Sequence, residues 1–239
     1  MRHKEPILEF KNVRKIFKNS TILNDCSFKI YEEEIIAILG KSGSGKSTII
    51  KLLLGLYKPE GGEIYFEGKK INYSSKEFSK SVGYVSQENS FYEKLTVQEN
   101  LNFFGKLYDV SKDDIQYRSK ELLDLVKLTP SKHTISEKLS GGMKRRLEFA
   151  ISLIHNPHIL ILDEPFAGLD IELREELWYV LERIKAANVT IIIITHLLSS
   201  VQKHADKALI LHNFNIKEHV VLKHNRIDLE KKFLEVVQK

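Results

Sequence analysis

The sequence predicts an α/β protein with a mainly parallel central sheet, an N-terminal antiparallel β subdomain and an inserted helical subdomain. Short apolar runs are the first observation, because continuous apolar runs are typical of parallel strands buried on both faces. They span residues 35–39, 159–162 and 191–194, the last of them inside a strand expected at residues 190–195. Strand-like and helix-like segments alternate on both sides of a stretch, at about residues 90–155, whose apolar spacing is helical throughout.

The N-terminal segment, residues 7–30, favours short antiparallel strands. Its first part, ILEFKNVRKIF, alternates between apolar and polar residues, and TILNDCSFKI follows a polar turn at residues 18–20. A glycine-rich turn comes after the buried run at 35–39, and a helix ending near Gly55 follows it at residues 47–56. Two more strand-like segments are expected at residues 61–71 and 81–87.

The middle of the chain carries helix-start signals. Thr96 is an expected N-cap with Glu99 three residues later, which is the pattern of a capping box. Ser111 and Asp114 repeat that spacing. The helices expected from there on span residues 111–128, 142–155 and 171–186.

Composition narrows the class of protein. The 239 residues carry a net charge of +5, and 42% are hydrophobic, which fits a folded domain rather than a disordered chain. No apolar stretch reaches membrane-spanning length, and the start MRHKEPILEF has charges but no apolar core of signal-peptide length, so we expect no export. The single Cys26 fits a reducing compartment. We therefore expect a soluble cytoplasmic protein, and without a basic run interleaved with aromatics we expect no nucleic-acid partner.

The segment GKSGSGKS is the strongest chemical signal. It follows a predicted strand and opens a predicted helix, as a phosphate-binding loop requires. Its glycines let backbone N–H groups surround a phosphate, Lys46 supplies a charge for the β- and γ-phosphates, and the Ser47 hydroxyl is a Mg²⁺ ligand. The nucleotide site is therefore expected to contain Gly40, Lys41, Ser42, Gly43, Ser44, Gly45, Lys46, Ser47 and Thr48.

The segment ILILDEP brings two carboxylates to the end of a buried strand, where ligands of α/β proteins bind. Successive strand residues point in opposite directions, so Asp163 and Glu164 have different tasks. We expect Asp163 to hold the Mg²⁺ shell and Glu164 to orient and polarise the attacking water. On its own the pair would more simply be a helix cap or a loop charge. Together with the phosphate loop it predicts a P-loop nucleotidase.

The segment LSGGM precedes a helix. Ser140 is its expected N-cap, and Gly141 and Gly142 leave N–H groups uncovered for a second phosphate contact. As an isolated pentapeptide it is most simply a capped helix start.

The run LSGGMKRRLEFAISLIHNPHILILDEPFAGLD resembles the signature-to-D-loop stretch of ATP-binding cassette (ABC) proteins, and GKSGSGKST is similar to their phosphate loop. The resemblance covers essentially the whole chain. It implies that Gln87 is the Q-loop residue that contacts Mg²⁺ and water, and that Asp170 belongs to the D-loop. It also implies that His196 is the switch histidine at the γ-phosphate. Phe17 falls where the family stacks an aromatic on adenine, although a strand aromatic is an equally simple interpretation.

The sequence is most similar to the ATPases of ABC-2 type exporters. That similarity rests on LSGGMKRR, LTVQENLNFFGKLYDV and the terminal LEKKFLEVV, which resembles their short C-terminal element, at about residues 213–239. Met143 stands where many members have glutamine, and Phe17 stands where tyrosine is common. We expect residues 1–239 to form a single ABC ATPase domain.

The resemblance implies ATP and Mg²⁺ as cofactors and an ATPase that powers transport. The implied catalytic groups are Glu164, His196, Lys46 and Gln87, with Ser47, Gln87 and Asp163 at the metal. Two copies, or one copy and a paralogue, would bind head to tail, each ATP lying between one phosphate loop and the other copy's Ser140, Gly141 and Gly142. An integral membrane permease would hold them at the inner face of the cell membrane, with export favoured over import.

Two other classes stay open from the sequence. A soluble ABC ATPase acting on nucleic acid or the ribosome shares the motifs, although the long coiled-coil insertion or second cassette of such proteins is not visible here. A plain P-loop kinase would not require LSGGM. The cargo is not encoded in this chain.

Overall fold

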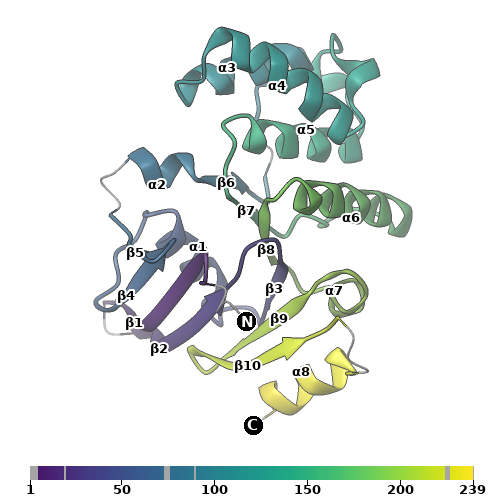
Figure 1. The fold of residues 1–239 in the computed structure, drawn as a ribbon. Helices are drawn as coiled ribbons and strands as arrows, with labels where there is room; N and C mark the ends of the chain where they lie inside the picture. Colours follow the sequence, from purple (N-terminus) through teal and green to yellow (C-terminus); the bar gives the residue numbers. More distant parts are fainter. Residues whose placement is uncertain (1–4, 19, 73–75, 89, 224–226, 239) are drawn as a thin grey trace. The chain divides into compact units, whose positions relative to one another are not determined.

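The computed structural model describes residues 5–18, 20–72, 76–88, 90–223 and 227–238. The chain divides into two compact units (Figure 1). The first combines residues 1–79 with 190–239, and the second consists of residues 80–189. The helical insert expected at about residues 90–155 falls inside the second unit. Each unit is described by itself below.

An antiparallel sheet forms from the N-terminal segment of the first unit. Its strand order is β2-β1-β4-β5. The strands are longer than the short ones expected, because the register from Leu8 opposite Ile30 to Phe17 opposite Ser20 continues through local irregularities. Phe10 and Phe28 stack with their ring centroids 4.3 Å apart on the buried face. The bounds are β1 (Leu8–Phe17), β2 (Ser20–Ile30), β4 (Gly61–Phe66) and β5 (Lys69–Lys70).

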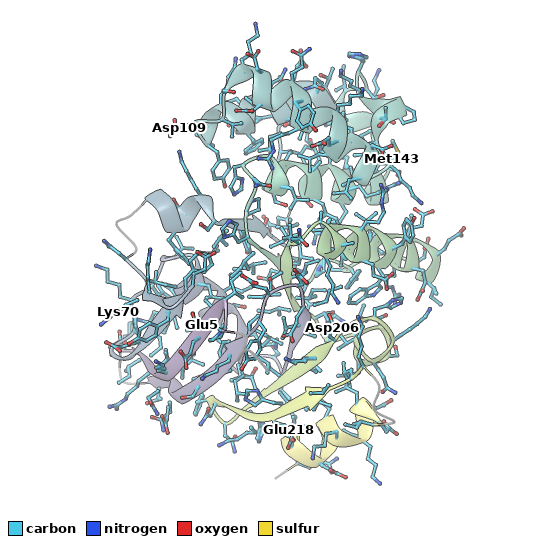
Figure 2. The ribbon with its side chains drawn as sticks, viewed as in Figure 1. Glu5, Lys70, Asp109, Met143, Asp206 and Glu218 are labelled. Carbon is cyan, nitrogen blue, oxygen red and sulfur yellow. The ribbon has the colours of Figure 1, made fainter. Side chains whose placement is uncertain are left out.

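Three parallel strands form the centre of the other sheet structure in this unit. β3 (Ile35–Leu39) lies between β8 (Thr190–Ile194) and β9 (Lys207–His212) and is parallel to both. Every residue of β3 and β8 is buried, which confirms the parallel strands expected from the apolar runs. The carboxylate of Asp206, labelled in Figure 2, accepts the N–H of Ile35 at 2.7 Å and fixes the start of β3.

A C-terminal hairpin adds β10 (Asn215–Val221), antiparallel to β9, which the sequence did not predict. Its two-residue turn has positive φ at both Asn213 and Phe214, the geometry of a type I′ turn. Leu229 and Val237 of the last helix are buried. The helices of this unit are α1 (Lys46–Leu53), α7 (Leu198–His204) and α8 (Leu229–Val237), and α2 (Lys76–Lys80) lies at the boundary in sequence between the units.

In the second unit, two parallel strands adjoin a group of helices. β6 (Val82–Val85) pairs with β7 (Ile159–Asp163). The Thr96 capping box and the Ser111 cap form as expected. Trp178 is fully buried and stacks on Phe166, with ring centroids 4.8 Å apart. The helical elements are α3 (Val97–Leu107), α4 (Lys112–Leu125), η1 (Thr129–Ser131), η2 (Ser136–Lys138), α5 (Gly141–Leu153) and α6 (Ile171–Ala186).

Among the residues that the structure describes, no helix combines the length and the apolar character needed to cross a lipid bilayer.

Candidate functional site

The phosphate loop follows β3 and ends where α1 begins at Lys46. The N–H of Ser44 donates to the carbonyl oxygen of Lys41 at 3.1 Å, so the loop turns back on itself. Gly45 has a φ of +109°, and a Cβ at this position would lie 2.9 Å from the carbonyl oxygen of Ile22. Both the backbone conformation and the close approach therefore require glycine immediately before the helix.

The two lysines of the loop have different partners. Lys46 Nζ donates to the carbonyl oxygens of Gly40 and Lys41, at 2.8 and 3.0 Å, so its ammonium group lies against the backbone of the loop. Lys41 Nζ instead donates to the carbonyl oxygen of Val237, at 2.9 Å, which ties the loop to the end of α8. The side chain of Ser47 is exposed in the first turn of α1. The start of α1 therefore offers a cation, a hydroxyl and the positive end of the helix dipole.

His196 follows β8 at the same sheet edge as the phosphate loop. β3 and β8 are parallel neighbours, with Ile38 opposite Ile194. Segments that follow neighbouring parallel strands leave the sheet at one edge, the edge at which α/β proteins bind ligands. His196 is exposed there. The backbone is shaped locally by Thr195, whose Oγ1 accepts the N–H of Leu197 at 3.3 Å.

Phe17 is the last residue of β1 and is partly exposed. Its ring makes an edge contact with Tyr57 at a centroid distance of 4.8 Å, and Lys15 Nζ lies 5.0 Å from the Phe17 centroid. The ring therefore packs on one side and remains accessible on another. Sequence reasoning missed Tyr57, which follows the end of α1 and has no pattern of its own.

In the second unit, β6 and β7 bring three predicted residues to one edge. The strands are parallel, with Val85 opposite Leu162. Gln87 lies two residues after β6 and is exposed. Asp163 is the last residue of β7, Glu164 is the next, and both are partly buried. This edge therefore presents an amide and two carboxylates.

The backbone of Glu164 is left-handed, with a φ of +47°. Its carbonyl oxygen accepts the N–H of Ala167 at 3.2 Å and Nη2 of Arg145 at 3.1 Å. A left-handed conformation costs a residue other than glycine roughly 1–2 kcal/mol and persists where its surroundings hold it. No pattern in the sequence predicted this conformation or the role of Arg145.

The LSGGM segment forms the expected capped helix start. The Ser140 side chain accepts the N–H of Met143, which Figure 2 labels at the beginning of α5. Gly141 is exposed, and a Cβ there would meet nothing within 4 Å. Gly142 is buried, and a Cβ there would lie 2.9 Å from Leu173 Cδ2. Gly141 therefore leaves the helix end open to solvent, whereas Gly142 allows α5 and α6 to approach closely.

Asp170 has a local task in addition to the role expected from the resemblance. It is the N-cap of α6, and its Oδ1 accepts the N–H of Leu173 at 2.9 Å. It is exposed in the loop that leads from the carboxylates of β7 to this helix.

The expected metal ligands are a hydroxyl from Ser47, an amide oxygen from Gln87 and a carboxylate from Asp163. All are hard oxygen donors, and Mg²⁺ is usually held by one or two carboxylates together with substrate phosphates and water. Among the described residues, no group of three or more His, Cys, Asp and Glu could hold a metal ion. The chemistry of these three oxygen donors therefore fits Mg²⁺.

Comparison with known proteins gives a consistent family match. Residues 23–167 match the model of the family described as ABC transporter. The Nod factor export ATP-binding protein I of Burkholderia lata is 35% identical over 204 residues, which are 85% of this chain and 67% of that protein. The spermidine/putrescine import ATP-binding protein PotA of Clostridium novyi is 34% identical over 90% of this chain and 62% of its own length.

Solved structures agree with the family match. The structure of cbiO1 from Clostridium perfringens, part of the ABC transporter complex cbiONQ, superposes with a TM-score of 0.87 at 29% identity. The match covers 92% of this chain and 90% of that one. The fold expected from the sequence, a parallel sheet with an antiparallel β portion and a helical subdomain, is therefore the fold of a known transporter subunit.

Proposed function

The chain belongs to the ABC transporter family, and from that premise we propose that its phosphate loop and its strand-end carboxylates both serve ATP hydrolysis. It is an ATP-binding and ATP-hydrolysing subunit that powers transport. One observation carries the assignment of residues: a phosphate loop with Lys46 at a helix start occurs together with Asp163 and Glu164 at a parallel strand end.

The residues divide the chemistry between them. Lys46 and the N–H groups of the loop bind the β- and γ-phosphates, and Phe17 supplies a ring for the adenine. Glu164 orients the attacking water and accepts its proton, and Gln87 and His196 position water and γ-phosphate. Ser47, Gln87 and Asp163 hold Mg²⁺, which neutralises phosphate charge when bound.

The working form is a pair of such subunits arranged head to tail. The exposed N-terminus of α5, with Ser140 and Gly141, suits an anion brought by another copy, because its N–H groups point outward and the helix dipole favours negative charge. The γ-phosphate holds the pair closed, and its loss on hydrolysis releases it. A homodimer and a pair with a paralogue both satisfy this geometry.

An exposed aromatic cluster supports a membrane permease as the other partner. Tyr92 and Phe103 are 51% and 41% exposed, their ring centroids are 4.7 Å apart, and Phe104 adjoins Phe103 at 5.3 Å. Large exposed aromatics concentrate at protein interfaces. The cluster belongs to the same unit as Gln87, so a permease bound there holds the subunit at the cytoplasmic face of the membrane and senses the Gln87 segment.

We assign the transport direction as export. One relative is named for export and another for import, so the family alone does not decide the direction. The assignment rests on LSGGMKRR and LTVQENLNFFGKLYDV, which resemble the ATPases of ABC-2 type exporters.

Two measurements test this function. Purified protein should release phosphate from ATP only with Mg²⁺, and Asp163→Asn should lower that rate with the fold retained by circular dichroism. Affinity purification from the native membrane should recover a polytopic membrane protein. Recovery of nucleic acid or ribosomes instead would favour the soluble ABC ATPase class and contradict the transporter assignment.

A further inference from the structure

A buried ion pair lies in α5, one turn after the exposed helix start. Arg145 Nη1 donates to Glu148 Oε2 at 2.7 Å, and the two residues are only 7% and 2% exposed. Neither residue belongs to the motifs that bind nucleotide. Burying two charged groups costs desolvation free energy, which is offset only where further hydrogen bonds satisfy both groups. The other hydrogen-bond partners of the pair therefore show which segments it holds in place.

The guanidinium of Arg145 connects two segments of the site. Nη1 donates to the carbonyl oxygen of Ser86 at 2.6 Å, immediately before Gln87. Nε donates to the carbonyl oxygen of Pro165 at 3.0 Å, and Nη2 donates to that of Glu164 at 3.1 Å. Only the planar, five-donor guanidinium group can bind these acceptors and a carboxylate at once.

Glu148 binds the Gln87 segment through its second carboxylate oxygen. Its Oε1 accepts the N–H of Ser90 at 3.0 Å while Oε2 binds Arg145. The segment that carries Gln87 is therefore held on both sides, at Ser86 by Arg145 and at Ser90 by Glu148. Burial raises the pKa of Glu148, and the hydrogen bond from Arg145 acts in the opposite direction.

Glu164 is one of the residues that Arg145 binds, and its backbone is left-handed, with a φ of +47°. The hydrogen bond from Arg145 fixes the carbonyl group of that residue, and the orientation of its peptide sets the direction in which its carboxylate leaves the backbone. Ser86, through its carbonyl oxygen, and Ser90, through Glu148, are thus linked by hydrogen bonds to the guanidinium that also binds the Glu164 carbonyl oxygen.

We propose that Arg145 and Glu148 are positioning residues for ATP hydrolysis, which hold the backbone of Glu164 in its left-handed conformation and couple it to the Gln87 segment. This inference rests on the proposed function, because it takes Glu164 as the residue that orients the attacking water. It predicts a loss of turnover without a loss of nucleotide binding, since the pair contacts neither the phosphate loop nor Phe17 in any bond described above.

The test is a double-mutant cycle between Arg145→Lys and Glu164→Gln. Lysine keeps the charge but cannot donate to all four acceptors. Arg145→Lys should lower kcat roughly tenfold to a hundredfold, with the ATP dissociation constant within about twofold of the parent. In the Glu164→Gln background, Arg145→Lys should leave the residual kcat unchanged, because residues that act as one unit are not additive. An equal fold-loss in both backgrounds would overturn the proposal.

Arg118→Lys is the matched control. Arg118 also lies in the second unit and donates to a carbonyl oxygen, that of Leu153, at 3.1 Å, and to Asn156 Oδ1 at 3.0 Å. Its replacement should change kcat by less than about twofold, since none of these bonds involves the strand ends. A kcat loss equal to that of Arg145→Lys would contradict the specific role of Arg145.

A second variant covers the case in which Arg145→Lys fails to fold. Arg145→Gln combined with Glu148→Gln leaves an amide pair with no buried charge, which should retain the melting temperature but not the turnover. Recovery of the parental kcat in this variant, or failure of both variants to fold, would assign the pair to folding alone and overturn the proposal. Failure of the proposed function is distinguishable, because Glu164→Gln by itself would then leave kcat unchanged.

Discussion

The side chain of Ser140 accepts the N–H of Met143 at 3.3 Å and caps α5 at the point where the helix end is open to solvent. The same residue is therefore an N-cap, which stabilises the subunit, and part of the surface proposed to meet a γ-phosphate. Aspartate separates these two tasks, because it caps a helix as well as serine does but repels an anion.

We predict that Ser140→Asp keeps the thermal stability of the parent but abolishes ATP-dependent pairing and lowers kcat. Ser140→Ala should lose roughly 1 kcal/mol of unfolding free energy through the missing cap, with a smaller effect on pairing. Denaturant unfolding measures the first property, and size-exclusion chromatography with Mg²⁺ and ATP measures the second. If Ser140→Asp pairs and hydrolyses ATP as the parent does, the α5 N-terminus does not receive a phosphate.

Glu164→Gln should keep ATP binding and lose turnover. Glutamine has nearly the shape of glutamate but cannot accept a proton, so kcat should fall by about 10²–10⁴-fold. The uncleaved γ-phosphate should then hold two subunits together, and light scattering should report a stable dimer with ATP and monomers with ADP. Parental ATPase activity in a preparation checked for contaminating enzymes would remove Glu164 from the mechanism.

Lys46→Ala should weaken nucleotide binding by about ten- to a hundredfold, which corresponds to the loss of a hydrogen bond to a charged group. Isothermal titration calorimetry with ATP measures this change. Lys41→Ala is the control, because the phosphate loop binds phosphate through backbone N–H groups, which this substitution keeps, and the Lys41 side chain donates to the carbonyl oxygen of Val237. An unchanged affinity in Lys46→Ala, or an equal loss in both variants, would argue against the phosphate-loop assignment of Lys46.

The elements that the sequence predicted well are those with local signals. Thr96 and Ser111 cap helices with groups three residues away, and β3 is apolar along its whole length, so their conformations depend little on distant residues. The β9–β10 hairpin was missed because its turn is Asn213–Phe214. A bulky aromatic with positive φ replaces the glycine on which hairpin prediction depends.

The candidate site was predictable where a motif carries its own chemistry. The phosphate loop and the strand-end carboxylates follow from residue type and spacing alone. Arg145 and Glu148 were missed because charged residues in a helix normally indicate a solvated face. Their partners are distant in the chain: Arg145 binds carbonyl groups 19 to 59 residues away, and Glu148 accepts the N–H of Ser90, 58 residues away. A glutamate between Leu147 and Phe149, both buried, was the one available signal.

His155 provides a pH-dependent prediction. It is buried, stacks on Tyr108 with ring centroids 3.8 Å apart, and its Nε2–H donates to the carbonyl oxygen of Val82 at 3.1 Å. Burial lowers the pKa of His155 from 6.5 to about 4, and the positive charge of Arg118 also lowers it. The folded protein thus keeps this imidazole neutral at a pH where the unfolded chain protonates it.

The sign of the effect follows from proton binding. Between pH 6.5 and about pH 4 the unfolded state binds more protons at this residue than the folded state does, so unfolding free energy falls as the pH is lowered through that range. Each pKa unit corresponds to about 1.4 kcal/mol, so the titration of His155 lowers the unfolding free energy by about 3 kcal/mol at pH 4 and has no effect on it above about pH 7.

His155→Gln should remove this part of the acid sensitivity, because glutamine can donate to the Val82 carbonyl oxygen but does not titrate. We expect the variant to be less stable than the parent at pH 7.5, since it lacks the ring that stacks on Tyr108. The difference between the two should shrink as the pH falls. Urea unfolding at pH 7.5, 6.5, 5.5 and 4.5 measures the difference in unfolding free energy between the two proteins. The carboxylates titrate alike in both proteins, so their contribution cancels in this difference. Curves that stay parallel across this range would show that His155 titrates alike in the folded and unfolded states.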